Sequence, residues 1–402
     1  MRNIAIINNG DSGSTGNIAM NLHHDLIKAG YNSVFCYGRG KAGNNYDTYR
    51  IDNAAEYRWH ALLTRITGKQ GFYSQKATTR LLTLFKNRNI DTIFIVCIHG
   101  YYINERRLYQ YIAECNIRLI HIMIDEYAYT GKCAYHDGCE RFLIGCGRCP
   151  HKKDYPSNLF LDGSKVVFES KLSAYKKLNN AVFVGPQFVV EQAQKSPLFQ
   201  NIKTEILDES IDTEIFRPKN VENIRKQLGI KSSKIVILTV VPYYGEKKDR
   251  KGGRYFIELA HLFEKDDRFV FVHVGYLNKK KEHLPNNFIP IGYISDLSLL
   301  AEYFSLGDIF VFPSLLDTMP NACLDALACG TPLLCFNVSG MPYIANDEVA
   351  TFVEPQNIDA MAEIIVSAHK KTPSIIEKCR NYALQRYDCR KYNEKLIKIA
   401  NK

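Results

Sequence analysis

Short apolar runs alternate with amphipathic segments along the whole chain. The segments between the runs carry apolar residues at helical spacing, as in Ile18, Leu22 and Leu26. The runs typical of buried strands occur in both halves of the sequence, at residues 2–8, 92–98, 118–124, 182–184, 234–241, 269–275, 287–291, 309–312 and 333–336. This alternation predicts an α/β protein with two doubly wound parallel sheets.

The clearest local pattern lies at residues 308–344. A predicted strand (309–312) leads into a polar loop that carries Asp317, and a short helix with Asp325 in its second turn follows. Ligands of parallel sheets bind at the carboxyl ends of strands and beside helix N-termini, so this pattern predicts a ligand site. An ordinary helix with one capping acid and one first-turn acid would give similar spacing.

Two further loops after predicted strands contain residues suited to phosphate. The first loop contains Gly13, Ser14 and Gly16, and glycine lets backbone N–H groups approach an anion closely. Arg250 and Lys251 stand between a buried strand and a helix in the second half, where paired cations suit a diphosphate. Alone, the first could be an ordinary turn and the second a solvated loop.

Residues 313–332 resemble the E-x7-E signature of family 4 of the retaining glycosyltransferases, which use nucleotide-sugars and have the GT-B fold. Asp325 stands where the family usually has Glu, and its side chain is one methylene shorter. By resemblance, Asp317 contacts donor-sugar hydroxyls and Asp325 contacts the ribose. The chain keeps these residues of the pattern: Pro313, Ser314, Asp317, Pro320, Asn321, Leu324, Ala326, Ala328, Cys329, Gly330, Thr331 and Pro332.

The same resemblance implies the rest of the donor site. Lys251, with Arg250 beside it, would bind the donor diphosphate. The Gly-Ser-Thr-Gly run that starts at Gly13 is similar to the opening of a bacterial exopolysaccharide, O-antigen and colanic-acid-type subgroup of the family. The further donor contacts implied are Met319, Pro320, Asn321, Gly13, Ser14 and Gly16.

The domain organisation follows from a stretch similar to the family's hinge, which keeps Ile211, Asp212, Phe216 and Pro218. We expect an acceptor-side Rossmann-like domain at residues 1–208, with a cysteine-rich insertion at about 125–155. A nucleotide-sugar-binding Rossmann-like domain is expected at 209–380. Residues 381–402 are expected to form a helix that returns to the first domain.

The resemblance implies a hexosyltransferase of cell-surface polysaccharide synthesis. It would move a sugar from a nucleotide diphospho-sugar to a glycan or lipid-diphosphate-linked oligosaccharide, with retention at the anomeric carbon. Family members need no metal for catalysis. In the mechanism usually considered for them, the leaving phosphate takes the acceptor proton.

The chain departs from the family at two further positions, of which the first is expected near the reacting sugar. Many relatives have His-Asp where this chain has Ile124 and Asp125, so His99 at the end of a neighbouring predicted strand is the candidate substitute, by elimination. Tyr343 replaces a frequent acid. These departures keep open a catalytically weak scaffold, and a nucleotide-sugar epimerase or hydrolase on the same fold is the other alternative.

Net positive charge is concentrated in the first half of the chain. Residues 1–200 contain 25 Lys and Arg against 16 Asp and Glu, whereas residues 201–402 contain 27 against 26. Residues 57–89 contain seven cations, no acid, and interleaved apolar side chains, which suits an anionic membrane face or a solvated helix equally. The balanced second half argues against nucleic acid as a partner.

The expected location is the cytoplasm, with peripheral contact to the cytoplasmic membrane face as a further expectation. No apolar run approaches the roughly 20 residues of a membrane span. The opening residues read as a strand that runs into a turn rather than as a signal peptide.

Four of the twelve cysteines have metal-like spacing. Cys133, Cys139, Cys146 and Cys149 give C-x5-C-x6-C-x2-C, and four thiolates can fill a tetrahedral zinc shell. Structural zinc that orders a long loop is the first interpretation. Free buried thiols and redox pairing are the alternatives.

Overall fold

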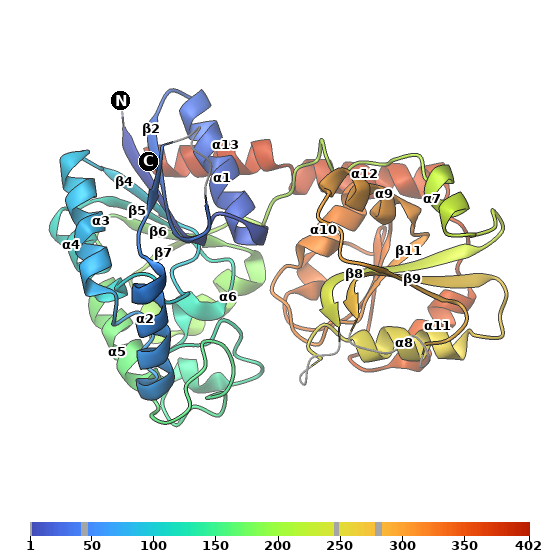
Figure 1. Cartoon of the computed structure of the whole chain (residues 1–402), viewed down its shortest axis with the longest axis horizontal. Coiled ribbons are helices and arrows are strands. Elements are labelled where there is room, and N and C mark those ends of the chain that lie inside the picture. The colour runs from blue at the N-terminus through green and yellow to red at the C-terminus, as the bar shows by residue number, and fades with distance from the viewer. Residues whose placement is uncertain (1, 42–46, 245–248, 278–283) are drawn as a thin grey trace. The chain divides into compact units, whose positions relative to one another are not determined.

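The computed structural model describes residues 2–41, 47–244, 249–277 and 284–402 of the 402-residue chain (Figure 1). The chain forms two compact units. The first contains Met1–Leu207 together with Asn393–Lys402, and the second contains Asp208–Tyr392. The grouping of the C-terminal segment with the first unit therefore begins at Asn393, later than the predicted residue 381.

Within the described residues, the first unit is built on a seven-stranded sheet in the order β3-β2-β1-β4-β5-β6-β7, with every paired neighbour parallel. Parallel neighbours need crossover helices, which the alternating pattern supplies. The elements are β1 Asn3–Gly10, α1 Gly13–Lys28, β2 Asn32–Arg39, β3 Thr48–Arg50, α2 Ala54–Thr67, α3 Gln75–Asn87, β4 Thr92–Ile95, α4 Glu105–Glu114, β5 Arg118–Ile122, η1 Glu126–Tyr129, η2 Glu140–Leu143, α5 Ser164–Tyr175, β6 Ala181–Gly185, α6 Gln187–Lys195, η3 Pro197–Phe199 and β7 Lys203–Ile206.

The second unit has a six-stranded sheet in the order β10-β9-β8-β11-β12-β13, again with parallel pairing, in the part of the chain that the structure describes. Its strands are nearly continuous apolar runs because both faces of the sheet are covered. The elements are α7 Glu222–Gln227, β8 Ile235–Tyr244, α8 Gly253–Leu262, β9 Phe269–Leu277, β10 Phe288–Gly292, α9 Leu297–Leu306, β11 Ile309–Phe312, α10 Asn321–Ala328, β12 Leu333–Phe336, η5 Met341–Tyr343, β13 Ala350–Val353, α11 Ile358–Val366, α12 Pro373–Arg386 and α13 Cys389–Asn401.

Each sheet has a point where the strand order reverses. The chain moves from β1 to β2 and β3 on one side and then crosses to β4 on the other, so the first sheet reverses between β1 and β4. The second sheet reverses in the same way between β8 and β11. Ligands of doubly wound sheets bind outside the carboxyl ends of the strands at such points.

The predicted α/β class with two Rossmann-like units is confirmed. Among the strand ends that differ, two affect the candidate site: β4 ends at Ile95 rather than at residue 98, and β5 ends at Ile122 rather than at residue 124. The residues beyond each strand end form loops instead, and those loops carry candidate site residues. None of the described helices is long and apolar enough to cross a membrane.

Candidate active site

The reversal point of the second sheet brings three predicted residues together. Arg250 and Lys251 follow β8, and Asp317 follows β11, the neighbouring strand. Lys251 Nζ forms an ion pair with Asp317 Oδ2, and Arg250 Nη1 lies 3.8 Å from the same oxygen. Arg250 Nη1 also donates to the Leu316 carbonyl at 2.6 Å. Lys247 and Lys248, earlier in the same basic run, lie outside the described residues.

The Asp317 carboxylate sets the position of the lysine. Asp317 is buried, whereas Lys251 and Arg250 are partly exposed. A buried carboxylate without a partner is costly, so Asp317 and Lys251 stay paired. An ammonium group has three N–H donors, and after one is used on Asp317, Lys251 keeps two for an anionic ligand.

Backbone contacts join the two loops that carry these side chains. Gly252 has a φ of 72°, and a Cβ there would lie 1.8 Å from the Pro313 carbonyl oxygen. The Leu315 N–H donates to the Arg250 carbonyl at 2.8 Å, and the Ser314 hydroxyl donates to the same carbonyl at 3.1 Å. Glycine is therefore required beside Lys251, because no side chain fits between the loops.

Asp325 lies in α10, and its environment is the opposite of that of Asp317. Its side chain is buried, and Oδ1 has no hydrogen-bond partner. Burial raises the pKa of the Asp325 carboxyl well above its ordinary value of 3.8. A buried oxygen without a partner suits a ligand that donates hydroxyl hydrogens.

The other expected donor contacts in this unit surround the start of α10. Pro320 is the N-cap of the helix and offers no capping side chain, and Asn321 is the first helical residue. Met319 is buried, and its Sδ accepts the Glu209 N–H at 3.3 Å. A Cβ on Gly340 would lie 1.7 Å from the Thr318 carbonyl oxygen, so glycine is needed for this close approach.

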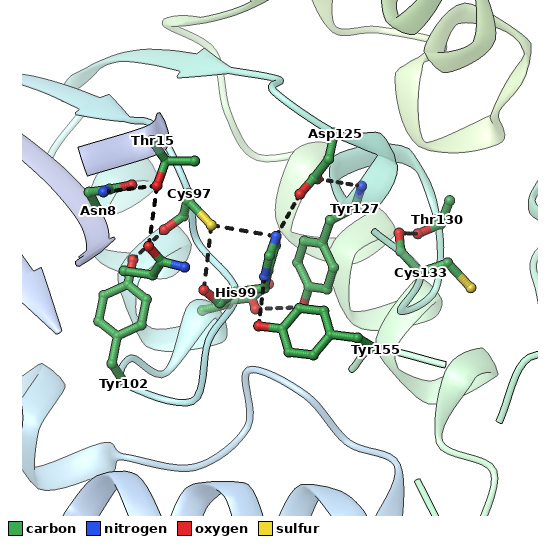
Figure 2. A network of polar contacts seen from close by, with 12 residues as sticks. Asn8, Thr15, Cys97, His99, Tyr102, Asp125, Tyr127, Thr130, Cys133 and Tyr155 are labelled. Carbon is green, nitrogen blue, oxygen red and sulfur yellow. Dashed lines mark hydrogen bonds and ion pairs between the residues drawn. The ribbon is translucent and has the colours of Figure 1, made fainter. Parts of the chain in front are cut away.

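The first unit brings His99 and Asp125 together near its own reversal point. His99 follows β4, Asp125 follows β5, and Figure 2 shows their side chains pointing toward one another. His99 Nε2 lies 2.7 Å from Asp125 Oδ2. The other Asp125 oxygen accepts the Tyr127 N–H at 3.0 Å, which fixes the carboxylate at the start of η1.

Two residues that the sequence did not point to complete this group. His99 Nδ1 lies 3.1 Å from the Tyr155 hydroxyl, and Cys97 Sγ lies 3.4 Å from His99 Nε2 (Figure 2). Burial disfavours the charged imidazole, but the facing Cys97 and Asp125 outweigh it and hold the pKa of His99 well above 6.5. Tyr155 is 56 positions from His99 in sequence, so no local motif could have indicated it.

The glycine-rich segment differs from its prediction. Helix α1 begins at Gly13, so Gly13, Ser14 and Gly16 lie in the first turn of the helix and not in the preceding loop. Gly16 permits the tight entry, because a Cβ there would lie 2.7 Å from the backbone of Asp11. The early start leaves α1 beside the carboxyl end of β1, where a helix N-terminus favours an anion.

The predicted zinc site is not supported. Among the residues that the structure describes, no group of three or more His, Cys, Asp or Glu is arranged to hold a metal ion. None of the thiols of Cys133, Cys139, Cys146 and Cys149 forms a disulfide. Cys133 and Cys149 hydrogen-bond to each other through their sulfur atoms, Cys146 Sγ accepts the Gly131 N–H at 3.2 Å, and Cys139 lines a surface hollow beside η2.

A buried lysine takes the loop-ordering role expected of the metal. Lys132 Nζ lies 2.7 Å from the Pro156 carbonyl oxygen and 2.9 Å from Asn158 Oδ1. The carbonyl oxygens of Lys152 and Asp154 each lie 3.2 Å from the same nitrogen. Four acceptors from one loop therefore surround one side chain, which holds the loop at residues 152–158 against the unit.

Comparison with known proteins agrees with this geometry. The sequence model of the family described as glycosyl transferases group 1 matches residues 220–386, which lie in the second unit. WcaC of Escherichia coli K12, assigned as a colanic acid biosynthesis glycosyl transferase, is 22% identical over 369 residues, which cover 85% of this chain and 87% of WcaC.

Two further proteins extend the comparison. The Escherichia coli UDP-Gal:alpha-D-GlcNAc-diphosphoundecaprenol alpha-1,3-galactosyltransferase is 26% identical over 212 residues, covering 48% of this chain and 53% of that enzyme. Anabaena HepE, solved with UDP, superposes with a TM-score of 0.65 at 11% identity and covers 99% of each chain.

The chain is therefore a glycosyltransferase with the GT-B fold, and residues 220–386 of its second unit match the glycosyl transferases group 1 family. The predicted resemblance to the bacterial exopolysaccharide, O-antigen and colanic-acid subgroup of family 4 is confirmed.

Proposed function

We propose that this protein transfers a hexose from a nucleoside diphospho-sugar to a glycan or lipid-diphosphate-linked oligosaccharide, with retention at the anomeric carbon, in cell-surface polysaccharide synthesis. The observation that carries the proposal is the meeting of Arg250, Lys251 and Asp317 at the reversal point of the second sheet. The names of the colanic acid and diphosphoundecaprenol relatives support the acceptor class.

The second unit binds the donor in this proposal. Lys251 and Arg250 hold the diphosphate, and Asp317 orients both the lysine and the sugar hydroxyls. Asp325 Oδ1, which has no hydrogen-bond partner within the protein, accepts a hydrogen bond from a ribose hydroxyl. Met319, Pro320 and Asn321 place the start of α10 beside the donor, where its N–H groups offset negative charge.

The reaction uses the leaving group as its base. The bond between the anomeric carbon and the diphosphate oxygen breaks, a bond to the acceptor oxygen forms on the same face, and the acceptor proton passes to the departing phosphate. Lys251 and Arg250 stabilise the charge that grows on that phosphate. In the first unit, His99 and Asp125 act on the reacting sugar in place of the missing family histidine, and Gly13, Ser14 and Gly16 in the first turn of α1 contact the donor.

Nucleotide binding tests the donor site directly. Calorimetry with UDP, GDP, ADP, CMP and dTDP should show one diphosphate binding clearly above the others, and Lys251→Ala should abolish that binding. The variants Lys251→Ala and Asp317→Ala should each reduce sugar transfer at least tenfold, which corresponds to about 1.4 kcal/mol of transition-state stabilisation. Lys231→Ala, at an exposed lysine of the same unit, is the matched control.

Two results would contradict the proposal. The donor site is wrong if no nucleotide binds at millimolar concentration, or if both variants keep near-normal rates with intact folding. Release of an altered sugar or sugar-nucleotide without any acceptor would favour an epimerase or hydrolase instead.

A further inference from the structure

The first unit exposes a group of large apolar side chains drawn from two separate segments. Trp59, Leu62 and Ile66 lie on one outward face of α2 at helical spacing, and Trp59 is 62% exposed. Leu159, Phe160 and Leu161 follow one another in the loop before α5, and Phe160 is 68% exposed. These six residues are called the apolar tip below. Single exposed apolar residues need no explanation, but three in succession beside an apolar helix face do.

The two segments are joined through their backbones. The Leu159 N–H donates to the Arg65 carbonyl at 2.7 Å, and the Leu161 N–H donates to the Ile66 carbonyl at 3.0 Å. Gly68, the left-handed C-cap of α2, packs so closely that a Cβ on it would lie 2.5 Å from the Gly163 nitrogen. The loop is therefore fastened along the last turn of the helix, so the two segments that carry the apolar tip lie side by side.

Hydrogen bonds of Lys132 and Asn158 also fix the loop. The oxygens of residues 152–158 surround buried Lys132, as described above, and Asn158 Nδ2 donates to the Leu161 carbonyl at 2.6 Å. A loop fixed in this way cannot turn its Leu-Phe-Leu run inward. The exposure of the apolar tip is thus built into the fold.

Charge around the apolar tip is mainly positive. Arg58 and Arg65 flank the apolar face of α2, and Lys152 and Lys153 stand exposed in the loop. The acidic side chains of the loop already have ion-pair or hydrogen-bond partners within the protein. Asp154 pairs with His151 at 3.0 Å, and Asp162 accepts the N–H groups of Cys149 and Ser164 at 2.7 and 3.0 Å.

We propose that the apolar tip docks into the interface of an anionic lipid bilayer. Apolar side chains enter the boundary between head groups and acyl chains, and the surrounding cations meet anionic head groups. The four cations around the apolar tip favour an anionic bilayer over a second copy of the chain. In a symmetric dimer, the same four cations of the second copy would repel those of the first. The inference extends the proposed lipid-linked acceptor, but the surface itself does not depend on the donor site.

The chain has an intrinsic probe for this contact. Trp59 is the one tryptophan of the 402 residues, and it lies in the apolar tip. On titration with vesicles of phosphatidylglycerol and phosphatidylcholine, Trp59 emission should shift to shorter wavelength, and lipids brominated near the head group should quench it. Pure phosphatidylcholine vesicles should bind at least tenfold more weakly, and added salt should weaken binding to the anionic vesicles.

Matched variants separate the apolar from the electrostatic contribution. Phe160→Ser and the double variant Lys152→Glu/Lys153→Glu should each reduce vesicle affinity at least tenfold. Leu262→Ser, at an exposed leucine of α8, and Lys231→Glu/Lys265→Glu, at exposed lysines of the second unit, should leave it unchanged. Because all these side chains are exposed, circular dichroism and thermal unfolding should match those of the parent protein.

Several outcomes would overturn the proposal: no vesicle binding by the parent protein, equal binding by Phe160→Ser, or a parent dimer that Phe160→Ser converts to a monomer without changing vesicle binding. The last would assign the surface to a second copy. Nucleotide binding distinguishes this proposal from the proposed function, because Phe160→Ser should bind the nucleotide normally and Lys251→Ala should bind vesicles normally.

Discussion

Asp317 and Asp325 are eight positions apart, and their carboxyl groups have opposite surroundings. Asp317 faces Lys251 and Arg250, so its negative charge is compensated without a ligand. Asp325 is buried with one oxygen unpartnered, and burial favours its neutral form. The family signature gives both positions the same weight, but only the structure shows that Asp317 is paired with cations of the protein whereas Asp325 has an oxygen that can accept a hydrogen bond from a ligand.

Asp325→Asn should therefore stabilise the protein. In the wild type, the raised pKa of Asp325 means that its contribution to stability is full below the ordinary value of 3.8 and is lost as pH rises toward the folded-state pKa. Asparagine has no such loss. We expect a gain on the order of 1 kcal/mol, or about 2–4 °C in Tm, at pH 8 and a smaller gain at pH 5.

Thermal unfolding at the two pH values measures this effect. Asp347→Asn, at an exposed aspartate of the same unit, should show no gain at either pH. A variant at Asp325 that is less stable at pH 8 than at pH 5, relative to wild type, would contradict the assignment.

At the scale of elements, the sequence predicts well those helix boundaries that neighbouring residues set, and predicts poorly those that depend on contacts with other segments. The short helix predicted after the Asp317 loop agrees with α10, because its start and end are set by local residues, Pro320 and Gly330. The start of α1 was placed too late, since it depends on the approach of Asp11 to Gly16. Tyr155 was missed because a distant loop, fixed by Lys132, brings it to His99.

Gly252 offers a test of the contact between the two donor-site loops. In Gly252→Ala, the new Cβ would lie 1.8 Å from the Pro313 carbonyl oxygen, a backbone atom that no side-chain rotation can move. The left-handed φ alone costs about 1–2 kcal/mol, and the displaced loops should add to that loss and weaken nucleotide binding.

Gly229→Ala is the matched control in the same unit. Its φ of 66° is similar, and a Cβ there meets nothing within 4 Å. Thermal unfolding and calorimetry should therefore show a larger loss for Gly252→Ala than for Gly229→Ala. Equal losses would mean that the loops tolerate separation.

At the scale of the whole molecule, α13 links the two ends of the sequence. The Arg118 guanidinium donates to the Ile399 carbonyl at 2.9 Å, and Asn393 Nδ2 donates to Asp25 Oδ2 at 2.6 Å. Residues 393–402 therefore complete the first unit, although they follow the second in sequence. The alternating pattern predicted two sheets, but contacts between residues 281 and 368 positions apart produce no periodic pattern in the sequence.

Leu396→Ala should destabilise the first unit selectively. Leu396 is fully buried in α13, and such truncations typically cost 2–5 kcal/mol. Calorimetric unfolding should show an earlier transition, while the stabilisation given by bound nucleotide to the second unit is retained. Lys395→Ala, at the exposed neighbouring position, should leave the transition unchanged. Loss of nucleotide binding in Leu396→Ala would contradict this separation.

The loop held by Lys132 carries Tyr155, which contacts His99, and leads into the Leu159–Leu161 part of the apolar tip. A protein anchored through that loop samples only the acceptors that diffuse in the same leaflet. Its turnover would follow the mole fraction of acceptor in the membrane rather than the molar concentration in the suspension. Diluting the acceptor with inert lipid, at constant total acceptor, would then slow the enzyme as effectively as removing substrate.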